Sequence, residues 1–121
     1  MLTRKRLIEF CLTFPGAYED YPFDENASVP DAWTVMRHRE NRKSFALLFD
    51  RNGRLNLNVK CEPMAAGLLR SVYPSVIPAY HMNKEHWNGV IVDGTVPEQE
   101  ILGWISQSYD LTKPKRKMKS S

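Results

Sequence analysis

The pattern of apolar and polar positions along the chain predicts three helices. Apolar side chains recur at helical spacing in three segments that are bounded by prolines, a glycine or a capping residue. We expect the helices at residues 3–13, 63–73 and 97–113. Thr3 is the expected N-cap of the first helix. The second helix is expected to have an apolar face of Met64, Leu68 and Val72, with Ala65 and Leu69.

Five further segments have the composition of strands, at 33–38, 44–49, 54–60, 76–80 and 87–92. Asn52-Gly53 predicts a hairpin turn between the second and third, because both residues tolerate positive φ. The arm 54–60 alternates strictly, so Leu55, Leu57 and Val59 should face the core. Its other side chains should face outward as a row of hydrogen-bonding groups: Arg54, Asn56, Asn58 and Lys60. Residues 18–31 are expected to be irregular.

The order helix, three strands, helix, two strands, helix predicts an α+β fold. The economical arrangement is a two-layer sandwich, with the helices on one face of a mostly antiparallel five-stranded sheet. The length of 121 residues fits a single domain, expected over residues 1–113. Residues 114–121 are expected to be a disordered basic tail.

Charge is distributed unevenly along the chain. The net charge is +3, but five of the 17 basic residues lie between Lys113 and the end, which leaves 12 basic against 14 acidic residues before them. The segment 37–60 nevertheless holds seven basic and two acidic residues, a local balance of +5. Residues 9–31 hold acids and no Lys or Arg. A basic surface on a slightly acidic domain is therefore expected.

Composition also excludes several classes of protein. No run approaches the roughly 20 apolar residues that span a membrane, and no signal peptide is indicated. Two cysteines, Cys11 and Cys61, make no disulfide framework, so reduced thiols in a cytoplasmic protein are expected. Glycine-rich phosphate loops and metal-ligand spacings are absent from the sequence, so we expect no cofactor and no metal.

The densest group of reactive side chains lies between Tyr80 and Trp87. His81, Lys84 and His86 could serve acid–base chemistry or contact phosphate. The favoured interpretation is that the histidines bond backbone groups in a turn while Tyr80 and Trp87 pack. Glu19-Asp20 is better explained as a solvated acidic loop than as a catalytic carboxylate pair. No catalytic residue is assigned, and an enzyme is not expected.

Six short stretches in a fixed order carry a family resemblance. They are Pro15-Gly16-x-x-Glu19-Asp20-Tyr21-Pro22-Phe23, Phe45-Ala46-Leu47-Leu48, Val59-Lys60-Cys61-x-Pro63, Tyr80-His81-x-Asn83-Lys84-x-His86-Trp87, Asp93-Gly94-x-Val96-Pro97 and Ser108-Tyr109-Asp110-Leu111. Together they resemble the MmcQ/YjbR family, and the motif of His81, Asn83, Lys84, His86 and Trp87 is the most specific part. Asp24–Asp31 departs from the family pattern as an insertion-like stretch.

The resemblance implies an α-β(3)-α-β(2)-α sandwich, similar in fold to type III secretion chaperones, with a double-wing surface for DNA. Our leading hypothesis is accordingly a protein that binds duplex DNA with a basic hairpin as one wing. The expected contacts are Arg37, Arg39, Arg51, Arg54, Lys60, Lys84 and His86. The alternative is a protein-interaction module without a nucleic-acid role. The third hypothesis is an enzymatic site in which His81, Lys84, His86 and Glu19 converge.

Overall fold

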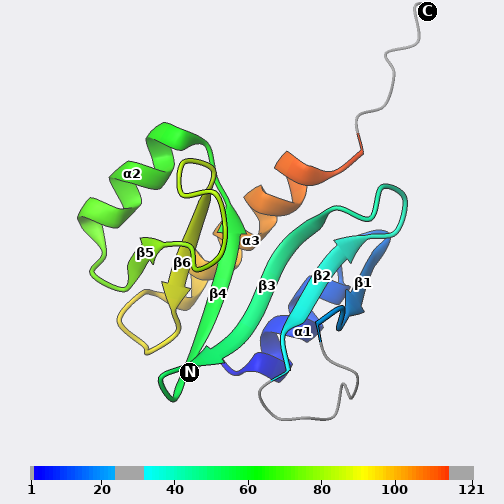
Figure 1. Ribbon diagram of the computed structural model, residues 1–121, viewed down its shortest axis with the longest axis horizontal. Helices are drawn as coiled ribbons and strands as arrows, with labels where there is room; N and C mark the ends of the chain where they lie inside the picture. Colours follow the sequence, from blue (N-terminus) through cyan, green and yellow to red (C-terminus); the bar gives the residue numbers. More distant parts are fainter. Residues whose placement is uncertain (1, 24–31, 115–121) are drawn as a thin grey trace, which may run out of the picture.

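The computed structural model describes residues 2–23 and 32–114, which form three helices and one six-stranded sheet (Figure 1). The elements are α1 (Arg4–Leu12), β1 (Ala17–Asp20), β2 (Thr34–His38), β3 (Ser44–Arg51), β4 (Arg54–Lys60), α2 (Pro63–Val72), β5 (Val76–Pro78), β6 (Trp87–Ile91) and α3 (Glu98–Thr112). The sheet order is β1-β2-β3-β4-β6-β5, and all neighbouring strands are antiparallel. The predicted α+β class is confirmed.

The prediction of five strands is wrong, because β1 adds a sixth. It lies at the sheet edge and pairs with β2, with Ala17 opposite His38 and Asp20 opposite Val35. Four residues are too few to show an alternating pattern, and acidic residues such as Glu19 have low strand propensity. Pairing with β2 therefore forms this strand, and four strands rather than three separate α1 from α2.

The predicted helix and hairpin signals are confirmed. The Thr3 hydroxyl accepts a hydrogen bond from the Arg6 N–H at 3.2 Å, which caps α1. Asn52 and Gly53 have φ values of 54° and 72°, as the turn between β3 and β4 requires. Short-range backbone chemistry therefore decides where these elements begin and end.

The main core lies between the sheet and the helices. α3 packs on β3 and β4, α1 packs on β1, and α2 packs on β5 and β6. Figure 1 shows α1 and α3 behind the sheet. Leu48, Leu57 and Val90 lie side by side across β3, β4 and β6, and they share a buried cluster with Ile101 and Ile105 of α3. This row of side chains thus defines the helix-covered side of the sheet.

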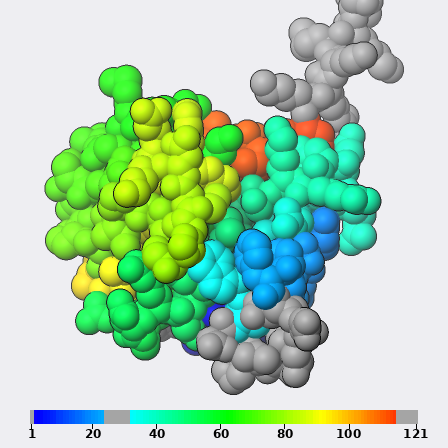
Figure 2. All heavy atoms as spheres, in the orientation of Figure 1, coloured from blue at the N-terminus to red at the C-terminus, as the bar shows by residue number. Residues whose placement is uncertain are grey.

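Residues 79–86, which we call the crossing segment, lie over part of the other side of the sheet, the front face (Figure 1). Figure 2 shows this segment, coloured yellow-green, standing out from the sheet. Beneath the segment, the Asn58 side chain donates to the Tyr80 carbonyl at 3.1 Å. Trp33 stacks flat on Phe49, with ring centroids 4.0 Å apart. The front face therefore has a small core of its own.

This covering contradicts one expectation about β4. Asn56 and Asn58 do lie on the side opposite Leu57, but they are only 5% and 0% exposed. Alternation predicts which residues share a side, yet it does not reveal that a distant segment covers that side. The predicted solvent-exposed row of hydrogen-bonding groups is therefore wrong at its two asparagines.

The apolar face predicted for α2 is wrong at Met64, Leu68 and Val72, although Leu69 of the same predicted face does contact the core. Met64, Leu68 and Val72 are 91%, 63% and 56% exposed. Ala66 is instead the buried residue of this helix, and Leu69 is partly buried against the core. The helix has two apolar faces. The face with Ala66 has the smaller side chains, so it allows α2 to lie closer to β5 and β6. The larger face is left in solvent.

Several expectations fall on residues outside the described ranges. Residues 115–121 of the expected tail and the insertion-like stretch Asp24–Asp31 belong to this group. Within the described residues, no helix has the length and apolar character needed to cross a bilayer.

Gly89 of β6 offers a test of how tightly the front face is packed. An added Cβ would lie 3.2 Å from Asn58 Oδ1, 3.3 Å from Ile77 Cγ1 and 3.4 Å from the Ala79 Cα. We expect Gly89→Ala to lower the free energy of unfolding by about 1–3 kcal/mol, because the buried neighbours must shift. Urea denaturation measures this change.

The matched control is Gly67→Ala in α2, where no atom lies within 4 Å of the added carbon. This variant should be stabilised by up to about 1 kcal/mol, because alanine favours the helix. Equal effects of the two substitutions would contradict the close packing at Gly89.

Candidate nucleic-acid interface

Four of the predicted contact residues project from one side of the sheet. Arg51 lies opposite Arg54 across the hairpin, and the strand register places Lys60 on the same side as Asn56 and Asn58. Arg37 of β2 belongs to the same side, because it alternates with Met36, which is buried in the main core. The front face thus collects four cations that are scattered along the sequence.

Two acids of the neighbouring strands point the other way, whereas Asp20 shares the front face with Arg37. Glu19 lies opposite Met36, and Asp50 lies opposite Leu55, so both are on the helix side of the sheet. Asp50 is also 3.6 Å from the Arg4 guanidinium on that side. The strand register therefore separates charge between the two faces of the sheet and leaves the front face basic.

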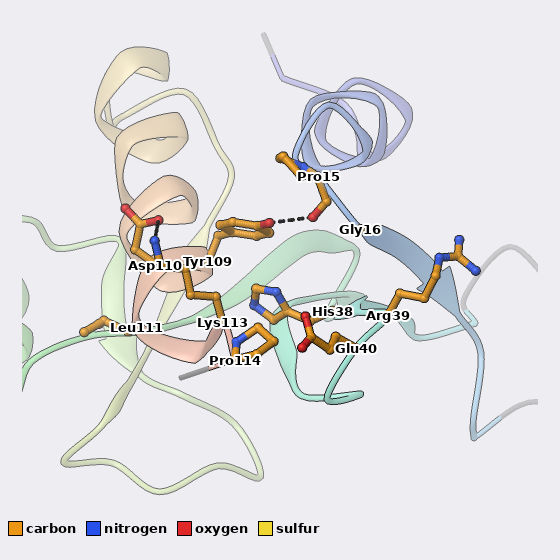
Figure 3. Close-up of a pocket in the computed structure, with 10 residues that line it drawn as sticks. All are labelled: Pro15, Gly16, His38, Arg39, Glu40, Tyr109, Asp110, Leu111, Lys113 and Pro114. Atoms are coloured by element: carbon orange, nitrogen blue, oxygen red, sulfur yellow. Dashed lines mark hydrogen bonds and ion pairs between the residues drawn. The ribbon is translucent and has the colours of Figure 1, made fainter. Parts of the chain in front are cut away.

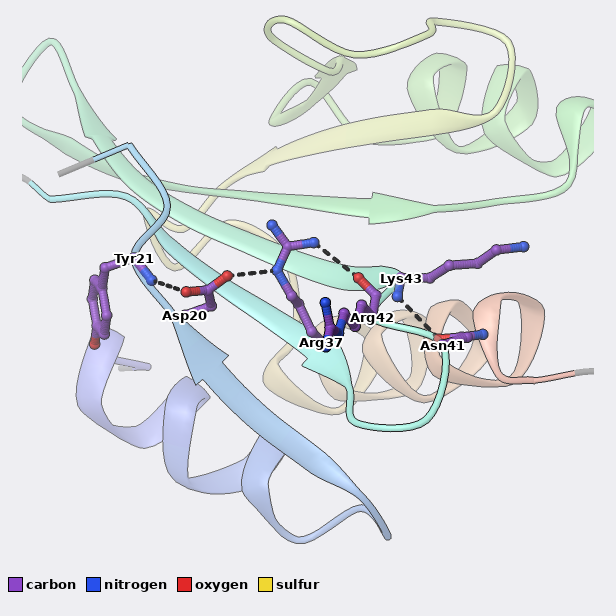
Figure 4. Close-up of polar contacts among 6 residues, drawn as sticks. All are labelled: Asp20, Tyr21, Arg37, Asn41, Arg42 and Lys43. Carbon is purple, nitrogen blue, oxygen red and sulfur yellow. Dashed lines mark hydrogen bonds and ion pairs between the residues drawn. The ribbon is translucent and has the colours of Figure 1, made fainter.

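Arg37 is held in a network of its own (Figure 4). Its Nε lies 2.8 Å from Asp20 Oδ2, and its Nη1 donates to the Arg42 carbonyl at 2.9 Å. The backbone N–H of Tyr21 donates to the other Asp20 oxygen. Because Asp20 neutralises part of its charge, Arg37 is the least available cation of the front face.

Arg51 and Arg54 occupy the tip of the β3–β4 hairpin, and both are exposed. The Arg51 guanidinium lies 4.0 Å from the centre of the Tyr80 ring. Such a cation–π contact orients the side chain while leaving its N–H groups able to donate. Neither arginine forms an ion pair within the described part of the chain. The hairpin tip therefore presents two uncompensated positive charges.

The remaining predicted cations lie toward the other end of the sheet. Lys60 ends β4, about 20 Å along the strand from Arg54 at the usual rise per residue. Arg39 follows β2, with its guanidinium 5.4 Å from the Tyr18 ring centre. Lys84 and His86 belong to the crossing segment. The predicted residues thus form an extended track rather than a compact pocket.

The His81–Trp87 motif builds the crossing segment mainly through backbone bonds. Asn83 Oδ1 accepts from the Glu85 N–H at 2.9 Å, which closes a turn. The His86 carbonyl accepts from Cys61 N–H, and the Lys84 carbonyl accepts from the Arg70 guanidinium. His81 has a positive φ of 64°, and its ring lies beside Tyr80 at 3.9 Å. The motif thus fastens the segment to β4 and α2.

Little in the structure supports an enzymatic site around His81, Lys84, His86 and Glu19. Glu19 accepts a hydrogen bond from the Tyr21 hydroxyl at 2.6 Å. None of the three cavities described for residues 2–23 and 32–114 is lined by any of the four residues. In the same part of the chain, no three His, Cys, Asp or Glu side chains are grouped to hold a metal ion.

The cysteines are also poorly suited to act as nucleophiles. Both thiols are unpaired and buried. Burial raises the pKa of the Cys11 thiol to about 12 and also raises the pKa of Cys61. The reactive thiolate is therefore suppressed at both positions.

A cavity of about 790 Å³ lies at the C-terminal end of α3 (Figure 3). His38, Tyr109 and Lys113 are among its lining residues. The Thr112 hydroxyl donates its proton to the Ser108 carbonyl, so it accepts from His38 Nε2–H at 2.8 Å. His38 is only 2% exposed. These contacts hold the His38 ring against the end of α3.

A second cavity, of about 300 Å³, lies on the front face beside the hairpin tip. Its walls are Arg51, Asn52, Arg54, Asn56, Ile77 and Ile91. The sequence indicated both arginines as contacts and placed Asn56 in the hydrogen-bonding row of β4, but it gave no signal that Ile77 and Ile91 lie beside it. Their juxtaposition depends on the pairing of β6 with both β4 and β5.

Comparison with known proteins reveals one family. The family model described as YjbR matches residues 12–111. The Bacillus subtilis protein YyaQ is 33% identical over 93% of this chain and 100% of its own length. The Escherichia coli K12 protein YjbR is 30% identical over 97% of each chain. Both relatives are described as uncharacterised.

Two solved structures are similar throughout. A Pseudomonas syringae protein shares 33% identity and a TM-score of 0.77, over 93% of this chain and 100% of that one. A Deinococcus radiodurans protein with a DUF419 domain shares 32% identity and a TM-score of 0.83, over 99% of this chain and 85% of that one. The similarity therefore extends over the whole fold.

The buried histidine predicts a specific pH dependence of stability. Burial, with a smaller contribution from Lys113, lowers the pKa of His38 below its ordinary 6.5, although a Tyr109 backbone bond opposes the shift. Above 6.5 the imidazole is neutral in both states. As the pH falls below 6.5, the unfolded chain takes up a proton that the folded protein resists, so the free energy of unfolding decreases.

Thermal melting of the wild type and of His38→Gln between about pH 8 and about pH 5 measures this effect. The wild type should lose more stability than the variant below 6.5, because glutamine does not titrate. Parallel curves for the two proteins would show that His38 contributes nothing to the acid sensitivity.

Proposed function

This chain belongs to the YjbR family, and we propose that it binds duplex DNA through the basic side chains of its front face. The observation that carries the proposal is the placement of Arg37, Arg51, Arg54 and Lys60 on one side of the sheet, with Glu19 and Asp50 on the other. Arginine and lysine contact DNA phosphates directly.

The size of the track suits a nucleic-acid backbone. The track is about 20 Å long, and one DNA strand has roughly six phosphates over that length. Arg39 and Lys84 extend the same basic region, and His86 lies beside Lys84. Attraction of this kind is independent of sequence, so the proposal is a DNA-binding domain that acts by binding and not by catalysis.

We also propose a cytoplasmic location for the protein. Both cysteines are unpaired and buried, which suits a reducing compartment.

Replacing cations of the front face tests the DNA proposal. The triple variant Arg51→Gln, Arg54→Gln, Lys60→Gln should bind duplex DNA more weakly. The slope of log K against log salt should become less steep by about 2–3, because up to three phosphate contacts are lost. Fluorescence anisotropy with a labelled duplex over a range of salt concentrations measures both quantities.

The matched control is Lys5→Gln, Arg6→Gln, Lys113→Gln, which removes the same charge from exposed positions of α1 and the end of α3. It should change affinity and salt slope much less. The proposal is wrong if the wild type does not bind at low salt, or if the two triple variants lose affinity equally.

A second candidate function is a protein-interaction module. The observation that favours it is the exposed face of α2, where Met64, Leu68 and Val72 form an apolar stripe. No charged side chain interrupts it, since Arg70, the helix's one charged residue, bonds the carbonyls of Ala66 and Lys84. An amphipathic helix of a partner protein suits such a stripe.

Leu68→Glu should abolish capture of such a partner, because a carboxylate would be buried at the contact. Leu12→Glu, at a leucine of α1 that is 42% exposed, is the matched control. The captured protein should be identified by mass spectrometry and its affinity for both purified variants measured by calorimetry. Equal affinity for the two variants would exclude α2 as the docking face.

A further inference from the structure

The cavity beside the hairpin tip has features that phosphate contact alone does not require. It measures about 300 Å³ and lies between the β3–β4 turn and strands β5 and β6. This volume is at the lower limit of small-molecule sites, so it suits one compact group rather than a length of strand. Two of its lining residues are cationic, two have carboxamide side chains and two are aliphatic.

The cationic wall is prepared for an anion. Arg51 is oriented by its contact with Tyr80, and Arg54 lies directly opposite Arg51 in the hairpin. Both are unpaired with acids within the described residues. Two guanidinium groups on adjacent strands suit a phosphate, which accepts hydrogen bonds from several donors at once.

Asn56 supplies a buried acceptor in the wall of the same cavity. Asn56 is only 5% exposed, and its Nδ2 donates to the Arg54 carbonyl at 3.0 Å. The planar carboxamide therefore directs Oδ1 away from that carbonyl. Oδ1 has no hydrogen-bond partner in the described structure, yet it is not among the side-chain atoms sealed from solvent. It is therefore open to a donor that enters the cavity.

The aliphatic wall gives the cavity an apolar surface. Ile91 lies opposite Asn56 in the β4–β6 pair, and Ile77 lies opposite Gly89 in the β5–β6 pair. Both isoleucines are partly exposed. Because Gly89 has no side chain, Ile77 packs closely against the β6 backbone beside Asn58. A flat, weakly polar ring would cover these aliphatic groups and leave its edge near Asn56.

We infer that this cavity accepts one unpaired nucleotide of a DNA strand. Arg51 and Arg54 bind the phosphate, Ile77 and Ile91 contact the face of the base, and a base N–H donates to Asn56 Oδ1. The inference rests on the proposed function and extends it. The basic track attracts DNA of any form, whereas the cavity discriminates in favour of DNA that has unpaired nucleotides.

The experiment compares three labelled DNAs by fluorescence anisotropy at one salt concentration. They are a blunt duplex, the same duplex with a short single-stranded overhang, and that duplex with an abasic overhang carrying the same number of phosphates. The natural overhang should bind roughly tenfold more tightly than the abasic one, because only the natural overhang supplies a base. The affinities for the abasic-overhang duplex and the blunt duplex should differ by less than this.

Two variants locate the preference in the cavity. Asn56→Leu removes the acceptor and should abolish the preference for the natural overhang, while binding to the blunt duplex is unchanged. Ile77→Glu places a carboxylate in the cavity and should also abolish the preference, and it should weaken binding to all three DNAs because the carboxylate attracts Arg51 and Arg54. Its matched control is Val72→Glu, at an exposed β-branched residue of α2, which should keep the preference. Circular dichroism melting verifies folding, and Ile77→Glu decides the matter if Asn56→Leu does not fold.

The outcomes separate the two proposals. Absence of binding to all three DNAs at low salt would overturn the proposed function and the inference together. Binding to the blunt duplex with equal affinity for natural and abasic overhangs would overturn the inference alone. Persistence of the preference in Ile77→Glu would also overturn the inference. A free mononucleotide that binds in an Asn56-dependent way, without any overhang preference, would assign the cavity to free nucleotides instead.

Discussion

The front face depends on one buried hydrogen bond, from the Asn58 side chain to the Tyr80 carbonyl at 3.1 Å. The buried amide N–H of Asn58 needs an acceptor, which only the crossing segment supplies, while Asn58 Oδ1 has no partner in the described part of the chain. The segment in turn buries Phe49, which stacks on Trp33. One amide and one aromatic stack therefore fasten the crossing segment over part of the side that the helices leave open.

The candidate interface follows from that closure. Tyr80 is held over the sheet by the crossing segment, and it orients Arg51 from there. The same segment stops short of the hairpin tip, where the cavity between Arg54 and Ile77 remains. The histidines of the motif take part through their backbone and ring contacts, which gives the His81–Trp87 motif a structural role whether or not it also contacts a ligand.

The fold keeps its two unusual surfaces apart. Positive charge gathers on the front face because the register turns Arg51 and Lys60 one way and Asp50 the other. The exposed apolar stripe is confined to α2, at the end of the sheet where β5 and β6 lie. A net charge of +3 conveys neither feature, since both arise from the side of an element on which a residue falls.

Local chemistry allowed much of this to be predicted from the sequence alone. The Thr3 cap, the Asn52-Gly53 turn and the basic segment 37–60 all follow from neighbouring residues. The tertiary structure decided the rest. Periodicity tells which side chains share a face, but the segment that covers Asn58 lies 22 residues away, and α2 had two apolar faces to offer. Which face of β4 or of α2 is buried depends on contacts between distant segments, and no local pattern encodes them. The position of the cavity at Asn56 depends on such contacts too.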